Sequence, residues 1–164
     1  MIIKSFKPSM NEIAPYIKEA VKNGKEVRLT VTGFSMYPLL RSGSDDVILS
    51  FSENIKKYDV VLFERKTGEY IFHRVIKVEG NLLTIAGDNE TKKEYPVEKE
   101  RVIAIMKAFI RSGKTHSADA LWYKIYSRLW LCIFPFRHIV SGILHRVMQL
   151  CRKTKGVLCY KKSK

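Results

Sequence analysis

Between Val27 and Ile110 the chain consists of short runs of β-branched and aromatic residues separated by turns, and this pattern constrains the fold more than any other feature. The runs are Val27–Thr32, Val47–Phe51, Val60–Phe63, Tyr70–Val78, Leu82–Ile85 and Val102–Phe109. The connections at Ser42-Gly43-Ser44, Lys66-Thr67-Gly68 and Glu79-Gly80-Asn81 carry residues typical of tight turns. Six strands in about 80 residues predict a mainly β fold, a small antiparallel sheet or barrel.

A short amphipathic helix is predicted ahead of these strands. Ser9 and Glu12 have the spacing of a capping box, which satisfies backbone N–H groups at the start of a helix. Apolar residues then recur at helical intervals as far as Asn23-Gly24, a typical helix end. They are Ile13, Tyr16, Ile17, Ala20 and Val21. We therefore expect a helix over residues 10–23, a β region over 27–110, and one domain over 1–110.

Beyond Arg111-Ser112-Gly113 the hydrophobic period becomes helical. Apolar residues line one face of a helix as far as Pro135, and a second apolar face begins after it. The first face holds Leu121, Trp122, Ile125, Tyr126, Leu129, Trp130, Ile133 and Phe134, and the second holds Ile139, Val140, Ile143, Leu144, Val147 and Met148. The sequence thus predicts a second unit over residues 111–164, a C-terminal amphipathic helical segment.

Most of the net charge of +14 belongs to this segment. Residues 1–110 carry 18 Lys and Arg against 15 Asp and Glu, whereas residues 111–164 carry 12 Lys and Arg against one acid, Asp119. Such a surface favours an anionic partner, either nucleic acid or an anionic lipid surface. Aromatic residues at helical spacing fit a lipid surface or a helix partner better than stacked bases, so nucleic acid is the weaker alternative.

Basic residues keep the C-terminal segment from forming a clean membrane-spanning helix. Lys124, Arg128, Arg137 and Arg146 interrupt every window of about 18 apolar residues. We therefore expect residues 119–155 to lie in the plane of a membrane surface and to make the protein membrane-associated. The alternative is a helical hairpin docked on the sheet or on a partner chain.

The remaining signals are negative. Residues 1–7 contain no apolar run long enough for a secretory signal or an N-terminal membrane span. Cys132, Cys151 and Cys159 are odd in number and lack the spacing of a zinc site or a disulfide framework. We expect no metal and no cofactor.

Chemistry is suggested by a serine displayed at a turn. Thr32-Gly33-Phe34-Ser35 ends the first strand and Met36-Tyr37-Pro38 follows, which places a hydroxyl and the Ser35 backbone N–H at the sheet edge. A serine in a turn is a weak signal by itself. Three further segments follow in order, Asp59-Val60-Val61, His73-Arg74-Val75 and Gly87-Asp88-Asn89.

Together these four segments, covering residues 28–106, resemble the type I signal peptidases and the LexA-like self-cleaving repressors. The resemblance implies a serine endopeptidase, with Ser35 as nucleophile, that removes a signal or leader peptide from an exported or precursor peptide. His73 stands where most bacterial members have a lysine base. In this respect the chain resembles the histidine-containing branch found in the endoplasmic reticulum and in archaea.

The chemistry expected of these residues follows from their pKa values. A serine hydroxyl is not ionised at neutral pH, whereas an imidazole with a pKa near 6.5 can accept its proton and pass it to the leaving amine. A third group should hold the imidazole in the right tautomer. Asp88 is our first expectation for this role, and Glu94 is the alternative because it takes the place of an acid found in the resembled histidine-type enzymes.

The chain also departs from the resembled family. Many members have a serine two positions before the nucleophile, where this chain has Gly33, so the oxyanion would be bound by the Ser35 backbone N–H, with Thr32 as a substitute donor. Members usually have a membrane-spanning helix ahead of the serine, and this chain has only the short helix over residues 10–23. Membrane contact would then depend on the C-terminal segment.

Two other functions remain open. A LexA-like self-cleaving regulator would need an upstream domain and a scissile loop, and only 34 residues precede Ser35. From a different class, the chain could be a non-catalytic basic module that binds membrane or nucleic acid through residues 111–164.

Overall fold

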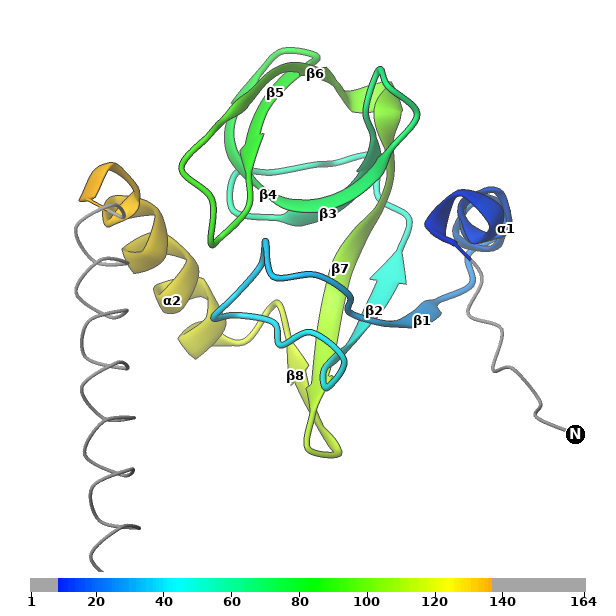
Figure 1. The fold of residues 1–164 in the computed structure, drawn as a ribbon, viewed down its shortest axis with the longest axis horizontal. Coiled ribbons are helices and arrows are strands. Elements are labelled where there is room, and N and C mark those ends of the chain that lie inside the picture. The colour runs from blue at the N-terminus through cyan, green and yellow to red at the C-terminus, as the bar shows by residue number, and fades with distance from the viewer. Residues whose placement is uncertain (1–8, 137–164) are drawn as a thin grey trace, which may run out of the picture.

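The structure, a computed structural model, describes residues 9–136 and confirms a mainly β fold with a helix at each end. The helices are α1 (Met10–Lys22) and α2 (Leu121–Cys132), and the strands are β1 (Val27–Thr30), β2 (Asp46–Ser50), β3 (Val60–Glu64), β4 (Tyr70–Glu79), β5 (Leu82–Ala86), β6 (Glu94–Glu98), β7 (Val102–Arg111) and β8 (Lys114–Ser117). Short 3₁₀ turns occupy Lys99–Arg101 and Phe134–Phe136. Figure 1 shows α1 and α2 on opposite sides of the sheet.

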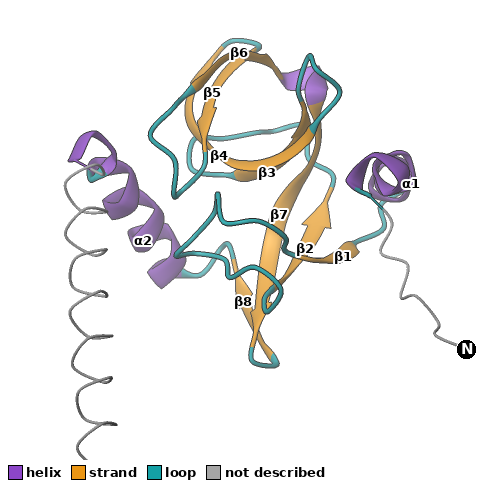
Figure 2. Ribbon diagram, in the orientation of Figure 1, coloured by secondary structure: helices purple, strands orange, loops and turns teal. Residues whose placement is uncertain are grey.

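All strand pairs are antiparallel, and the order across the sheet is β1-β2-β7-β3-β4-β5-β6, with β8 paired to β7. The sheet curls strongly around β3 to β6 (Figure 2) but does not close, because β1 and β6 lie at its two ends. The six strands expected from the sequence all form. Register shifts along β2, β3, β4 and β5 mark bulges, which let a sheet curl in this way.

The sequence analysis did not predict two of the strands, β6 and β8. The strand β6 contains Pro96 and two glutamates, a composition that argues against a strand except at a sheet edge, which is where β6 lies. The strand β8 is four polar residues that continue the β7 hairpin through Ser112 and Gly113, both at positive φ. The formation of both strands depends on pairing with a neighbouring strand rather than on a hydrophobic pattern.

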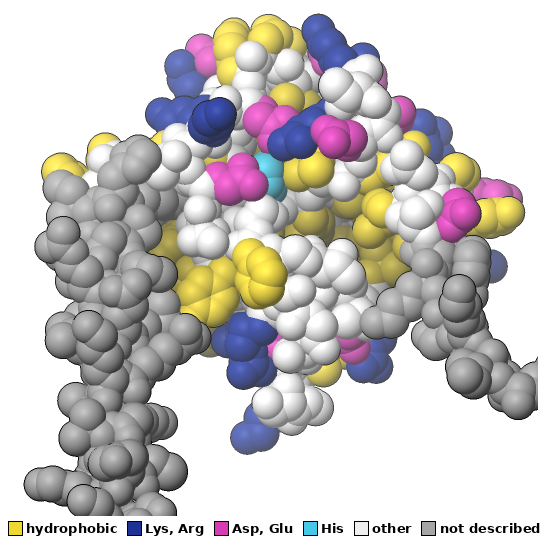
Figure 3. Space-filling view, viewed as in Figure 1, with side chains coloured by type: hydrophobic (Ala, Val, Ile, Leu, Met, Phe, Trp, Pro, Cys, Tyr) yellow, Lys and Arg dark blue, Asp and Glu magenta, His cyan; other side chains and the backbone are white. Residues whose placement is uncertain are grey.

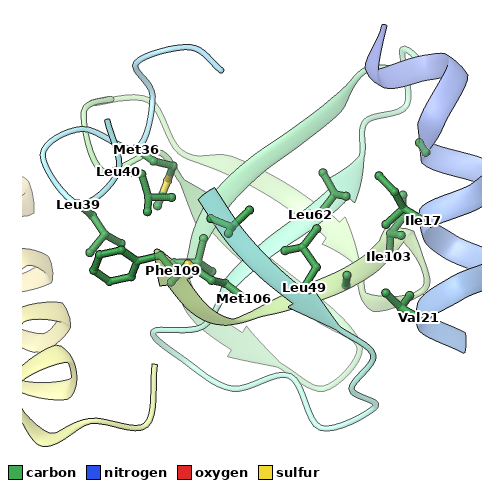
Figure 4. Packing of buried hydrophobic residues seen from close by; sticks show 14 of the residues in the cluster. Ile17, Val21, Met36, Leu39, Leu40, Leu49, Leu62, Ile103, Met106 and Phe109 are labelled. Atoms are coloured by element: carbon green, nitrogen blue, oxygen red, sulfur yellow. The ribbon is translucent and has the colours of Figure 1, made fainter. Parts of the chain in front are cut away.

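The hydrophobic core has two parts because both faces of β3 are buried. Val60 and Leu62 point into a larger cluster, while Val61 and Phe63 point into a smaller one inside the curl. In the larger cluster (Figure 4), Ile17 and Val21 of α1 pack near Ile103 of β7. The expected capping box begins α1, since the Ser9 N–H donates to the Glu12 carboxylate over 2.7 Å.

The helical C-terminal segment begins later than its expected boundary at residue 111. The strand β7 runs through Arg111, and β8 pairs with it before α2 starts. The first predicted amphipathic helix appears as α2, whereas the second, over residues 139–148, lies outside the described residues. Among residues 9–136, no helix has both the length and the apolar character that crossing a bilayer requires.

Candidate active site

The turn after β1 carries Ser35 in a cleft. Gly33 has φ +84°, a conformation that glycine adopts without strain, and its N–H donates to Ser42 Oγ over 3.1 Å. The Ser35 carbonyl oxygen accepts a hydrogen bond of 2.7 Å from the Asn89 N–H. The turn of residues 87–89 therefore fixes the backbone of the candidate nucleophile.

Gly87 in that turn is where Ser35 and His73 meet. A Cβ at this position would lie 2.7 Å from the Ser35 carbonyl oxygen and 3.0 Å from His73 Nε2. Only a glycine permits so close an approach of three segments. The structure thus brings the Ser35 backbone and the His73 imidazole, which lie 38 positions apart in the sequence, against the same glycine.

His73 lies in β4, opposite Val61 of β3, and its side chain is 1% exposed. Its two ring nitrogens face two carboxylates: Nε2 is 3.5 Å from Glu90 Oε1, and Nδ1 is 3.1 Å from Glu94 Oε1. The approach of Glu94 is poorly aligned for a hydrogen bond, so this contact is an electrostatic one at close range. Burial lowers the pKa of His73, and the charges of Glu90 and Glu94 offset only part of that effect.

Glu94 is held in place by Arg65, which lies in the turn between β3 and β4. Arg65 donates from Nε to Oε2 and from NH2 to Oε1, each over 2.7 Å, which is a two-pronged ion pair. Arg65 is held in turn by Glu69 over 3.0 Å. Burial alone would raise the pKa of Glu94, but the hydrogen bonds and charge of Arg65 keep it below its usual value. Glu94 is therefore a carboxylate, fixed beside the imidazole.

Asp88 has a different partner from the one expected. Its carboxylate accepts hydrogen bonds from Arg74 Nε over 2.8 Å and from Arg74 NH2 over 2.7 Å, and both side chains are 1% exposed. The reason is the alternation of side chains along β4, which sends Arg74 and His73 to opposite faces of the sheet. The structure thus places Glu94, the alternative, beside the imidazole, and uses Asp88 to neutralise a buried arginine.

A cleft of about 410 Å³ leads to Ser35. It is mostly apolar, and Glu90 is its one charged lining residue in the described chain. The apolar side chains come from β1, β2, β3 and β4 and the turn after β1, namely Leu29, Val31, Phe34, Val47, Leu49, Leu62, Ile71 and Phe72. Figure 3 shows hydrophobic side chains inside a hollow of this face, with acidic and basic side chains beside it.

The second oxyanion donor stays a prediction. Thr32 lines the cleft together with Gly33 and Ser35, and it is still the substitute donor that we expect. Phe34, next to the serine, is 71% exposed.

Sequence reasoning missed Arg65 and Glu90. Glu90 follows the Gly87-Asp88-Asn89 segment directly, so its position beside the site could have been inferred. Arg65 is 29 residues from Glu94, and only the pairing of β3, β4, β5 and β6 brings the two together.

Comparison with known proteins leaves the site to be judged on its geometry. No model of a known protein family matches this chain, and no curated protein sequence matches it either.

Proposed function

We propose that this protein is a serine endopeptidase of the signal peptidase type, with Ser35 as nucleophile, His73 as general base and Glu94 as the group that orients the imidazole. The observation that carries the proposal is the position of His73, which is buried with its Nε2 against Gly87, the glycine that also contacts the Ser35 carbonyl oxygen, and with Glu94 at its Nδ1 side. A neutral imidazole with a carboxylate behind it is the arrangement that activates a serine.

The reaction divides into two half-reactions, acylation and hydrolysis of the ester, and His73 accepts and then gives up a proton in each. As Ser35 Oγ attacks the scissile carbonyl carbon, its proton moves to Nε2, and the imidazolium is stabilised by Glu94. The same proton then goes to the departing amine, which leaves an acyl ester on Ser35 Oγ. Water attacks that ester with His73 again as base, which releases the second product and restores the serine.

The cleft supports an extended peptide as the substrate. Its apolar lining suits the hydrophobic side chains of a signal or leader segment, and β1 at the open end of the sheet could accept an added strand. We therefore propose a precursor peptide or protein as the substrate.

Membrane association is the second part of the proposal. The outward side of α2 leaves Leu121, Ile125 and Leu129 exposed, with Lys124 and Arg128 exposed beside them. An apolar stripe next to basic residues is typical of a helix that lies in a membrane surface. This supports the expectation for the described part of residues 119–155.

Replacing the nucleophile and the base tests the peptidase. Ser35→Ala and His73→Ala should each remove nearly all cleavage of a soluble leader peptide, and the double variant should be hardly worse, because the two groups act as one unit. The control is Cys132→Ala, an exposed residue of α2. Full activity in His73→Ala would exclude the proposed base, and full activity in Ser35→Ala would exclude a serine peptidase altogether.

A further inference from the structure

The inner face of α2 buries polar groups together with aromatic rings, which is unusual for a helix packed on a β domain. Tyr123 and Ser127 are buried, whereas Leu121, Ile125 and Leu129 are exposed. A helix that docked through hydrophobic burial alone would have the opposite arrangement. The inner face of α2 is therefore held by specific polar contacts in addition to the Tyr123 ring, which belongs to the larger hydrophobic cluster.

Those contacts converge on Arg74. Its NH1 donates to Ser127 Oγ over 2.8 Å, to the Tyr123 hydroxyl over 3.3 Å and to the Tyr58 carbonyl oxygen over 3.0 Å. The guanidinium also lies 5.7 Å from the centre of the Tyr123 ring. With the Asp88 carboxylate on its other side, this buried cation has partners from three parts of the chain.

A second contact reaches the catalytic turn directly. Trp130 Nε1 donates to the Asp88 carbonyl oxygen over 3.0 Å, from the same helix. The next residue, Asn89, donates its N–H to the Ser35 carbonyl oxygen over 2.7 Å. An unbroken path of short polar contacts therefore runs from α2 through residues 88 and 89 to the backbone of the candidate nucleophile.

We propose that α2 is part of the catalytic apparatus: Ser127 and Trp130 are positioning residues that fix the turn of residues 87–89, and through it Ser35, against His73. The proposal rests on the peptidase function proposed above and adds a role for the C-terminal segment, which sequence patterning treated as a separable tail. The turn has no strand pairing of its own after β5 ends at Ala86. Two backbone hydrogen bonds hold it, from the Asn89 N–H to the Ser35 carbonyl oxygen and from the Glu90 N–H to the Gly87 carbonyl oxygen, and the side chains of Arg74 and Trp130 add contacts to Asp88.

The geometry gives the expected size of the effect. A serine nucleophile reacts only when its oxygen and the base are in the right relative positions, and a displacement of about 1 Å can cost about 100-fold in rate. Removing one of several contacts should displace the turn less than that. We expect about a tenfold loss in kcat with KM little changed, since the apolar cleft is lined by other elements.

The test compares Ser127→Ala and Trp130→Phe with Cys132→Ala, which alters an exposed side chain of the same helix. Cleavage of a soluble leader peptide gives kcat and KM, and titration with a fluorophosphonate counts the reactive serines. Amide hydrogen exchange, read by NMR, follows the Asn89 N–H in each variant. In Ser127→Ala and Trp130→Phe, we expect kcat per titrated serine to be about tenfold lower than in the unaltered protein. We also expect the rate of exchange to increase more at Asn89 than in the core strands. Neither quantity should change in Cys132→Ala.

Two results would overturn the proposal. One is an unchanged kcat per titrated serine in both variants. The other is faster exchange throughout the sheet with no added effect at Asn89, which would make α2 a packing element only. If Ser127→Ala does not fold, Trp130→Phe still gives both readouts. Cleavage that survives Ser35→Ala would end the peptidase proposal, while exchange at Asn89 would still decide whether α2 holds the turn.

Discussion

Glu94 and Asp88, the two candidates for the orienting acid, have different partners, and substitution should separate their effects. Glu94→Gln removes the charge beside Nδ1, and we expect kcat to fall on the order of 100-fold, because the imidazolium formed in the reaction loses its counter-charge. The partly exposed pair with Arg65 adds little to stability, so unfolding free energy should change by about 1 kcal/mol or less. Urea unfolding and steady-state kinetics measure the two effects.

Asp88→Asn should show the reverse balance. The variant leaves the Arg74 guanidinium buried without its counter-charge, which costs about 3–5 kcal/mol of unfolding free energy. The kcat of the folded Asp88→Asn protein should be higher than that of Glu94→Gln. Glu98→Gln is the matched control for Glu94→Gln, because Glu98 is also in β6 but pairs with Arg101 and Lys66. A larger loss of kcat in folded Asp88→Asn than in Glu94→Gln would return the orienting role to Asp88.

The pH dependence of activity depends on the surroundings of His73. The imidazole must be neutral to act as a base, so activity appears as pH rises through its pKa. Burial lowers this pKa, and therefore the acid limb of the kcat/KM profile should lie below the usual value of about 6.5. Arg65 adds to the lowering through its positive charge. Arg65→Gln should raise the pKa and move the acid limb to higher pH.

The control for this shift is Arg101→Gln, which removes a positive charge that is paired with Glu98 rather than with Glu94. Its acid limb should match that of the unaltered protein. An Arg65→Gln profile that stays in place or moves to lower pH would show that Arg65 does not act on His73 through charge.

At the level of secondary structure, hydrophobic patterning was sufficient for most of the fold. Six strands follow from runs of β-branched and aromatic residues between turns, and α1 follows from its helical period of apolar residues. The strand β6 could not be recognised, since Pro96 and its charged neighbours make it stable only beside β5. Glu94 begins β6, so the hydrophobic pattern gave no sign of its position, and only the family resemblance named it as an alternative partner of His73.

The active-site residues on β4 show a second limit of sequence reasoning. His73 and Arg74 are adjacent, and alternation along a strand requires them to face opposite ways. That rule, applied to the sequence, would have shown that one acid could not serve both. It could not have shown which acid lies on which side, because this depends on the register of β5 and on a turn with no strand pairing.

At the level of the whole molecule, the two faces of α2 have different surroundings. Its inner face contacts Arg74 and Asp88, and its outer face exposes Leu121, Ile125 and Leu129. A helix anchored by polar contacts can leave its apolar side available to a membrane without loosening the fold. The proposed membrane contact and the proposed catalytic turn would thus share a single rigid helix, so the site would lie at a fixed distance from the membrane surface.

Vesicle binding by the full chain tests the outer face. The variant Ile125→Ser/Leu129→Ser should bind vesicles of phosphatidylcholine and phosphatidylglycerol about tenfold more weakly, because two apolar side chains no longer enter the interface. Binding should also weaken with added salt, since Lys124 and Arg128 lie beside the stripe. Tyr16→Ser is the control, because Tyr16 is an exposed aromatic side chain on α1 at the other side of the sheet (Figure 1). Equal binding by the double variant and the control would show that the outer face of α2 does not contact the membrane, and the apolar stripe would then need a protein partner instead.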